Sequence, residues 1–294
     1  MNPDDVTLSN VDKMFFPGAG LTKGDVIAHY RTAAARMVPH LAGRPLTMRR
    51  YPDGIDGNGF FQKDASDHFP EWIRVEEVPQ RQGGTIHHVV CDDAATLVYL
   101  ANQATIEFHV WLSTMDDLER PDRMVIDIDP PEGVPVRVLR DVARRLASCY
   151  REIGLTPYVQ ATGGRGFHVV APLDRSADYD QARELSVAVA DHVAAADPDL
   201  LTTAQRKDKR GDRIFLDCNR NAYGQTFVAP YSLRARPSAG VATPLTWDEL
   251  SRTEPDGFTP ARIARRRRQD PWSGMDDDAG SVTKARDAVQ GFGP

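Results

Sequence analysis

Three aspartates in this sequence have the type and spacing to carry out chemistry. Asp127 and Asp129 stand one residue apart in the apolar run MVIDID. Side chains of a strand alternate between its two faces, so both carboxylates point the same way, away from the isoleucines. Neighbouring like charges raise each other's pKa unless a cation lies between them. The pair predicts a bound magnesium or manganese ion, since both prefer oxygen ligands. A solvated strand end is the alternative.

A third carboxylate, Asp217, closes the run RIFLDC. Three acids at the ends of neighbouring strands can hold two metal ions roughly 4 Å apart. Such a pair of ions activates an attacking oxygen and stabilises a leaving one during phosphoryl transfer. The three aspartates together favour this chemistry over a purely structural role.

A glycine-rich turn, QATGGRGFHVV, lies between the two acidic runs. Its glycines permit a tight turn whose amides can approach an anion, and Arg165 is a fork-shaped phosphate donor. His168 lies on the strand that leaves the turn. No GK[ST] follows and no helix begins there, so the turn is not the P-loop of an ATPase. Taken alone, the glycines are better explained by a plain hairpin and His168 by a hydrogen-bonded core histidine.

Two sets of alternating elements must position these residues. In the first part, to about residue 120, we expect helices over 22–42 and 93–104 and strands near 45–52, 59–63, 85–91 and 106–112. In the second part we expect strands at 123–129, 157–162, 167–173, 213–218 and 225–233, with helices over 134–155 and 178–196. These elements predict an α+β fold of mixed sheets backed by helices. We expect a single domain over 1–272, with parts 1–120 and 121–272, and a polar, disordered tail over 273–294.

The composition is that of an ordinary globular protein, with 41% hydrophobic and 27% charged residues and a net charge of −6. No apolar run of about 18 residues and no signal peptide is visible, which predicts a cytoplasmic protein without a membrane partner. The three cysteines lie far apart outside any CxxC spacing, which argues against disulfides and a zinc site.

MVIDIDPPEG, TGGRGFHV and RIFLD, followed by APYSLRAR, resemble the three motifs of the archaeo-eukaryotic primase superfamily. The sequence is most similar to the polymerase domain of the bacterial ligase D type, from NVDKMFFP to TWDEL. The resemblance implies a primase-polymerase-like catalytic core behind an N-terminal α/β part. It also implies a template-dependent nucleotidyltransferase that adds NTPs or dNTPs to a 3'-OH at gaps or broken ends, often favours ribonucleotides and uses manganese well.

The resemblance assigns roles to individual residues of the catalytic part. Asp127, Asp129 and Asp217 become the catalytic acids that hold two Mn²⁺ or Mg²⁺ ions. Family members often carry lysine where Arg165 stands, so the charge is kept, whereas glycine at 164 removes a hydroxyl contact. The nucleotide-binding residues implied are Thr162, Gly164, Arg165, His168, Arg210, Ser232, Arg234 and His109.

The N-terminal part carries the DNA-end side of the resemblance. Lys13 and Lys23 resemble lysines that recognise a 5'-phosphate, and a phosphate at Lys23 would also gain from free amides in the first helical turn. Phe60 and Phe61 resemble a pair that contacts the template. They are consecutive on an expected strand, so we expect one in the core and one exposed as a stacking platform. Residues that would line the same groove, or be merely solvated, are Arg50 and Lys63.

Two other functions use the same residues. A metal-dependent phosphodiesterase or nuclease could use the three acids, and a non-catalytic DNA-end-bridging module could use the lysines and phenylalanines. The sequence lacks a KxDG ligase motif and a nuclease domain, so we expect a stand-alone polymerase domain or a piece of a larger ligase. The partners expected are DNA with gaps, overhangs or a 5'-phosphate, and a Ku protein with a separate ATP-dependent ligase, in a nucleoid-associated location.

Overall fold

The computed structural model describes residues 1–266 and 269–291, which form two compact units. As far as they are described, unit 1 comprises Met1–Asp116, Thr226–Thr243 and Asp256–Arg268, and unit 2 comprises Asp117–Gln225, Pro244–Pro255 and Gln269–Pro294. We expected one change of character near residue 120, and the first boundary does lie there. The chain also returns to unit 1 twice: a late strand pairs with an early one in its sheet, and a late helix contacts the first long helix.

The elements of unit 1 follow the chain through its first 116 residues and then its two later segments. They are η1 (Pro3–Asp5), β1 (Met14–Phe16), η2 (Pro17–Ala19), β2 (Leu21–Thr22), α1 (Lys23–Leu41), β3 (Leu46–Arg50), β4 (Phe60–Gln62), β5 (Val75–Pro79), β6 (Thr85–Val89), α2 (Ala94–Asn102), β7 (Thr105–Trp111), β13 (Thr226–Val228) and α6 (Pro260–Arg265).

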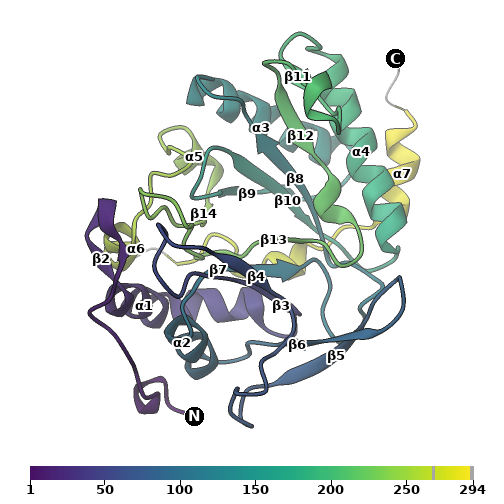
Figure 1. Cartoon of the computed structure of the whole chain (residues 1–294). Coiled ribbons are helices and arrows are strands. Elements are labelled where there is room, and N and C mark those ends of the chain that lie inside the picture. Colours follow the sequence, from purple (N-terminus) through teal and green to yellow (C-terminus); the bar gives the residue numbers. More distant parts are fainter. Residues whose placement is uncertain (267–268, 292–294) are drawn as a thin grey trace. The chain divides into compact units, whose positions relative to one another are not determined.

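The centre of unit 1 is an antiparallel sheet in the order β13-β7-β3-β4, with α1 and α2 packed against it (Figure 1). The α1 helix begins with the predicted capping box, in which Thr22 and Asp25 bond each other's backbone amides. Its Tyr30 is fully buried, packs edge-on against Phe108 of β7 and donates a hydrogen bond to the Ile106 carbonyl. The helices therefore cover one face of the sheet and leave the other for polar side chains.

Unit 2 contains the remaining helices and strands. They are β8 (Arg123–Asp129), α3 (Val136–Glu152), β9 (Tyr158–Ala161), β10 (Phe167–Pro172), α4 (Tyr179–Ala195), β11 (Leu201–Thr202), η3 (Lys207–Lys209), β12 (Ile214–Asp217), η4 (Asn219–Asn221), β14 (Thr243–Leu245, which starts at the boundary), α5 (Trp247–Leu250), η5 (Met275–Asp278) and α7 (Val282–Val289).

The strands of unit 2 form a mixed sheet in the order β11-β12-β8-β10-β9-β14, in which β11 and β12 are parallel. The α3 and α4 helices contact each other and β8, so they cover the same face (Figure 1). In α3, Leu139, Val142 and Leu146 recur at helical spacing and are buried against the sheet. The predicted α+β fold, with mixed sheets backed by helices, is confirmed.

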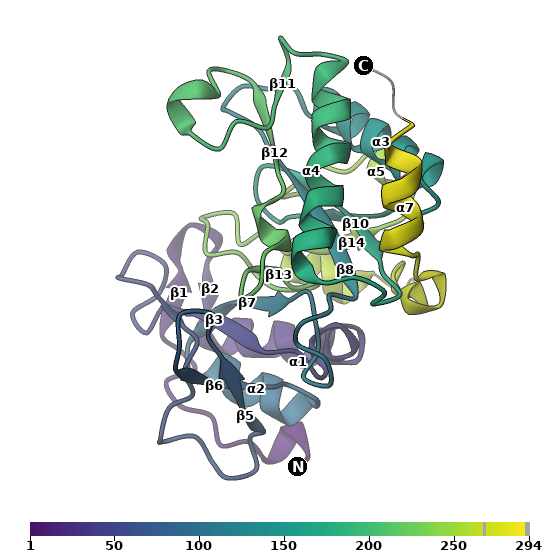
Figure 2. The same ribbon diagram turned by 90° about the vertical axis from the view of Figure 1, so that its right-hand side faces the viewer.

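The prediction of a disordered tail from residue 273 is wrong for residues 273–291; residues 292–294 lie outside the described part. Trp272 and Met275 are buried, and the Trp272 indole N–H donates to the Val159 carbonyl. The α7 helix lies along α4, as Figure 2 shows, and is joined to it by an ion pair between Arg286 and Glu184. A polar segment can thus be ordered by partners that its own composition does not reveal.

Across the described residues, 1–266 and 269–291, the structure contains no helix long and apolar enough to cross a membrane.

Candidate active site

Four polar residues form a row across the sheet of unit 2. Gln160 on β9 lies opposite His168 on β10, His168 lies opposite Asp127 on β8, and Asp127 lies opposite Asp217 on β12. Directly opposed residues of neighbouring strands point to the same side of a sheet. Asp129, two residues beyond Asp127 on β8, shares that side. The three aspartates predicted as metal ligands therefore lie on one face, opposite the face that α3 and α4 cover.

The row is partly buried and polar contacts link its members. His168 is buried, and its Nε2 lies 3.5 Å from Asp127 Oδ1. Gln160 Nε2 lies 3.5 Å from His168 Nδ1. Since an amide nitrogen can only donate, this contact favours the tautomer that carries its proton on Nε2, toward Asp127.

The surroundings of Asp217 disfavour its charged form. Burial raises the pKa of its carboxyl group, and the negative charge of Asp127 raises it further, against a hydrogen bond from the Asn219 amide at 2.8 Å. A cation between the two carboxylates would remove this cost. The chemistry of the donor set therefore fits a hard divalent ion.

The side chains are not, however, arranged around a common ion position. Among residues 1–266 and 269–291, no group of three His, Cys, Asp or Glu side chains could hold a metal ion as it stands. Asp129 instead makes an ion pair with Arg165, whose guanidinium lies 3.2 Å from it. Asp129 must turn away from Arg165 before three acids can share an ion.

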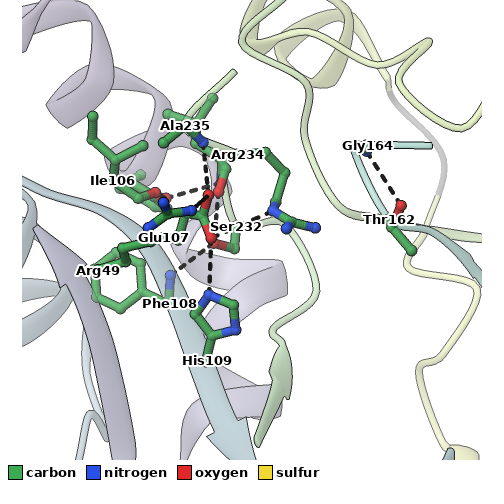
Figure 3. A network of polar contacts seen from close by, with 12 residues as sticks. Arg49, Ile106, Glu107, Phe108, His109, Thr162, Gly164, Ser232, Arg234 and Ala235 are labelled. Atoms are coloured by element: carbon green, nitrogen blue, oxygen red, sulfur yellow. Dashed lines mark hydrogen bonds and ion pairs between the residues drawn. The ribbon is translucent and has the colours of Figure 1, made fainter. Parts of the chain in front are cut away.

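The glycine-rich turn connects β9 to β10 and is held by Thr162. The Thr162 hydroxyl donates to the Gly166 carbonyl at 2.9 Å and accepts from the Gly166 amide. It also accepts from the Gly164 amide (Figure 3). The Gly163 amide donates to the Pro255 carbonyl. The amides expected to approach an anion are thus engaged inside the protein, and Arg165 is the exposed cation of the turn.

Arg210 is held above the same face of the sheet. Its guanidinium carbon lies 3.5 Å from the ring centre of Phe215. Phe215 belongs to β12 and lies opposite Asp129 of β8. The guanidinium also donates to the carbonyls of Ala204 and Gln205. The structure therefore brings Arg210 to the side of the sheet that bears the acids.

Unit 1 contains a second polar cluster, centred on a residue that the sequence analysis missed. Glu107 lies two residues before His109 on β7 and contacts Arg49, His109, Arg234 and the Ala235 amide (Figure 3). The signal for it was the alternation EFH, which places both ionisable side chains on one face of the strand. His109 and Arg234, both predicted near the nucleotide, are thus joined through one carboxylate.

Ser232, the third predicted nucleotide residue of unit 1, has a different environment. It is fully buried, and its hydroxyl accepts from the Phe108 amide at 2.8 Å and donates to the Leu233 carbonyl at 3.0 Å. These bonds fix the segment after β13 to β7. A direct contact with a nucleotide is therefore not supported, and the role seen is to hold the chain beside Arg234.

The two predicted 5'-phosphate lysines lie close together at the start of α1. Lys23 is buried, and its ammonium group donates to the carbonyl and hydroxyl of Ser9. Burial lowers the Lys23 pKa, and the charge of Lys13 lowers it further. Lys13 makes an exposed ion pair with Asp53. Lys23 is therefore a buried cation with neutral hydrogen-bond partners.

The first-turn amides of α1 that we expected to be free are engaged. Those of Lys23 and Gly24 donate to the carbonyls of Lys13 and Val11, and that of Asp25 donates to the Thr22 hydroxyl. Any phosphate bound there would rely on the lysine side chains.

The expectation of one buried and one exposed phenylalanine on β4 is wrong. Phe60 is 46% exposed and Phe61 is 61% exposed. The reason is that β4 is an edge strand at the end of its sheet, where neither face is fully covered. Arg50 is half-buried, donating to the Gln103 carbonyl and the Gln62 side chain, whereas Lys63 is exposed.

Comparison with known proteins identifies the class as a nucleotidyltransferase of the DNA polymerase type. A solved structure described as the polymerase domain from Mycobacterium tuberculosis ligase D in complex with DNA matches with a TM-score of 0.86 and 33% identity, over 94% of this chain and 99% of that one. Residues 22–272 match the family described as LigD, primase-polymerase domain. The chain belongs to this family, as the resemblance of its motifs indicated.

Curated relatives come from several bacteria. They include the multifunctional non-homologous end joining DNA repair protein LigD of Mycobacterium tuberculosis, 36% identical over 253 residues, or 83% of this chain. The bifunctional non-homologous end joining protein LigD of Bacillus subtilis is 32% identical over 254 residues, or 86% of this chain. The multifunctional LigD of Pseudomonas aeruginosa is 29% identical over 274 residues, or 91%. The chain spans 33%, 40% and 32% of the lengths of these relatives.

Proposed function

We propose that this chain is a template-dependent primase-polymerase of DNA repair, which adds NTPs or dNTPs to a 3'-OH at gaps or broken ends. The observation that carries the proposal is the register of β8 and β12, which sets Asp127 directly opposite Asp217 with Asp129 on the same face. The names of the relatives, which refer to DNA repair by non-homologous end joining, support the same activity.

In this proposal Asp127, Asp129 and Asp217 hold two divalent ions, Mn²⁺ or Mg²⁺. When bound, such ions activate the attacking 3'-oxygen and stabilise charge on the leaving pyrophosphate. Arg165 leaves Asp129 and contacts the triphosphate, which frees that carboxylate. His168 on the adjacent strand β10 hydrogen-bonds to the triphosphate. Arg210 adds a second guanidinium group, and two such groups suit a polyanionic nucleotide.

The DNA partner is proposed from two features of unit 1. The buried cation Lys23 beside Lys13 would gain an anionic partner in a 5'-phosphate, which relieves the cost of its burial. The exposed rings of Phe60 and Phe61 offer surfaces on which bases can stack, for roughly 1–3 kcal/mol per base. The matched ligase D structure is itself in complex with DNA. A Ku protein and a separate ATP-dependent ligase would then complete end joining.

Primer extension by purified protein with Mn²⁺ and ribonucleotides tests the activity. Asp127→Ala should reduce the rate by several orders of magnitude, because the ions bound there provide most of the charge stabilisation. The exposed Asp199→Asn, at the end of the loop after α4, is the matched control and should extend normally. Full extension by Asp127→Ala would overturn the assignment.

The same assay separates the two competing functions. Loss of labelled DNA ends without incorporation would indicate a metal-dependent phosphodiesterase that uses the same acids. End bridging by the wild type without any extension, undiminished in an Asp127, Asp129 and Asp217 triple variant, would indicate a non-catalytic module. Comparing a gap with and without a 5'-phosphate reports on Lys13 and Lys23.

A further inference from the structure

Glu107 is a carboxylate buried in unit 1, and N–H groups of four residues lie around its two oxygens. Its side chain is 2% exposed. Oε1 accepts from Arg49 Nη1 at 3.3 Å and from the Ala235 amide at 2.8 Å. Oε2 accepts from His109 Nε2 at 2.9 Å and lies 3.5 Å from Arg234 Nε. These three hydrogen bonds and one ion pair come from β3, β7 and the segment after β13, so one side chain ties three parts of the unit together.

These neighbours keep Glu107 in its negatively charged form. Burial by itself would raise the pKa of this carboxyl group. The hydrogen bond from His109, the charges of Arg234 and His109 and the Ala235 amide together outweigh burial and lower the pKa to about 2. Glu107 is therefore ionised at neutral pH.

The cluster nevertheless keeps an excess of positive charge. Arg49 and Arg234 contribute two positive charges against the single negative charge of Glu107, whatever the state of His109. The side chains of Arg49, Arg234 and His109 are 35%, 19% and 13% exposed, so each reaches the surface while the carboxylate beneath them does not. Such a group suits an anionic ligand, because the buried carboxylate orients the cations without neutralising them.

Aromatic rings lie directly beside the cations. The Arg49 guanidinium carbon lies 5.3 Å from the ring centre of Phe61 and 5.2 Å from that of Tyr51. The Phe61 ring packs edge-on against His109, with their centres 5.9 Å apart. A ligand that is both anionic and flat, as a nucleotide is, matches this combination of guanidinium groups and an exposed ring.

We infer that Glu107 is the positioning residue that fixes His109, Arg234 and Arg49 for a nucleoside triphosphate, and that Arg49 is a further nucleotide-binding residue. The inference rests on the proposed polymerase function and deepens it. Glu107 does not touch the ligand itself. It holds two guanidinium groups and one imidazole in fixed directions, and it keeps the imidazole proton on Nε2, because a carboxylate can only accept.

Glu107→Gln separates this role from simple packing. Glutamine has the same shape, but one of its two terminal atoms becomes an NH₂ group that can only donate. That group must face either the pair Arg49 and Ala235 or the pair His109 and Arg234, all of which are donors. One half of the cluster is thus repelled while the volume of the core is unchanged.

Two measurements on the purified protein test the inference. Calorimetric titration with ATP and Mn²⁺ should show binding at least tenfold weaker in Glu107→Gln, with KM for the nucleotide rising more than kcat falls. Long-range ¹H–¹⁵N spectra of the histidine rings should show the Nε2-protonated form of His109 in the wild type and a changed ring signal in the variant. Glu71→Gln, an exposed glutamate in the same unit, is the matched control and should change neither.

A second variant covers the case in which Glu107→Gln does not fold. Arg49→Gln alters a partly exposed side chain and should also weaken ATP binding severalfold, with an unchanged unfolding midpoint. Wild-type ATP affinity in both variants, or an unchanged His109 signal in a folded Glu107→Gln, would overturn the inference. If the wild type binds ATP but extends no primer, the proposed function fails while these binding and spectroscopic outcomes still decide the role of Glu107.

Discussion

The carboxyl groups of Asp217 and Glu107, one in each polar cluster, have pKa values shifted in opposite directions. Burial raises the pKa of Asp217, and its nearest acidic neighbour Asp127 adds to the effect. Burial also acts to raise the pKa of the more deeply buried Glu107, yet His109, Arg234 and the Ala235 amide together lower it to about 2. The difference lies in the cations that the protein itself supplies. The site at Asp217 is short of positive charge, whereas the site at Glu107 has it in excess.

This contrast predicts that Asp217→Asn stabilises the protein while abolishing extension. The pKa of Asp217 is raised in the folded state, so this group loses its proton more readily in the unfolded chain. The folded protein therefore loses stability as the pH rises from the ordinary carboxyl pKa to the raised value. At pH 7 the asparagine variant should therefore show the higher melting temperature. Below pH 3.8, the ordinary value, both forms are neutral and the difference should vanish.

Added Mn²⁺ provides a second readout for the same variant. An ion that binds only the folded state raises the melting temperature by mass action. The wild type should gain more from Mn²⁺ than Asp217→Asn, and Asp199→Asn should behave as the wild type. An equal gain in all three proteins would show that Asp217 is not a ligand.

At the scale of elements, the position of the acids depends on how closely β8 and β10 approach. Gly166 precedes β10, and a Cβ placed there would lie 1.8 Å from the Ile128 carbonyl oxygen on β8. No side chain fits, so the strands can meet at this point only with glycine. The register that sets His168 beside Asp127 begins at this contact.

Gly166→Ala should therefore disturb both stability and activity. An extra methyl group in a space that is already filled typically destabilises a protein by about 1–3 kcal/mol. We expect a loss near about 3 kcal/mol here, because the neighbouring atom belongs to the backbone and cannot move aside. Urea unfolding should show the lower midpoint, and primer extension should fall as His168 and Arg165 shift. Gly18→Ala, where a Cβ would meet its neighbours at 3.6 and 3.7 Å, is the control and should be close to neutral. A wild-type midpoint for Gly166→Ala would contradict the close approach.

At the scale of the whole molecule, the last described segment contributes to the stability of unit 2. Arg123, whose side chain is 4% exposed, pairs with Asp276 at 2.9 Å, and Leu173 forms a β-bridge with Gly280. Val282 and Ala285 of α7 are buried. The segment thus covers side chains at the ends of β8 and β10, the strands that carry the acids and His168.

A chain ending at Asp270 should consequently unfold at a clearly lower urea concentration. Loss of the buried Trp272 side chain alone typically costs about 3–5 kcal/mol, and Arg123 would lose its carboxylate partner. A chain ending at Gly291 removes only residues outside the described part and serves as the control. Equal midpoints for the two truncated chains would show that the segment contributes nothing to folding.

Several features could be read directly from the sequence because they depend on neighbours along the chain. The period-two alternation of MVIDID places Asp127 and Asp129 on one face, and the Thr22 and Asp25 spacing marks the start of α1. The motif order also identified the family, which the comparisons confirm. These signals are local and survive whatever the rest of the chain does.

The remaining features depend on residues brought together from distant positions. The sequence showed Asp217 as a third acid, but only the antiparallel register of β12 on β8 sets it opposite Asp127. The alternation EFH placed Glu107 on the same face as His109, but it did not show that Arg49 and Arg234 would surround this glutamate. Local periodicity thus determined which side chains share a face, whereas tertiary packing decided their burial, charge partners and pKa, because those properties depend on neighbours far away in the chain.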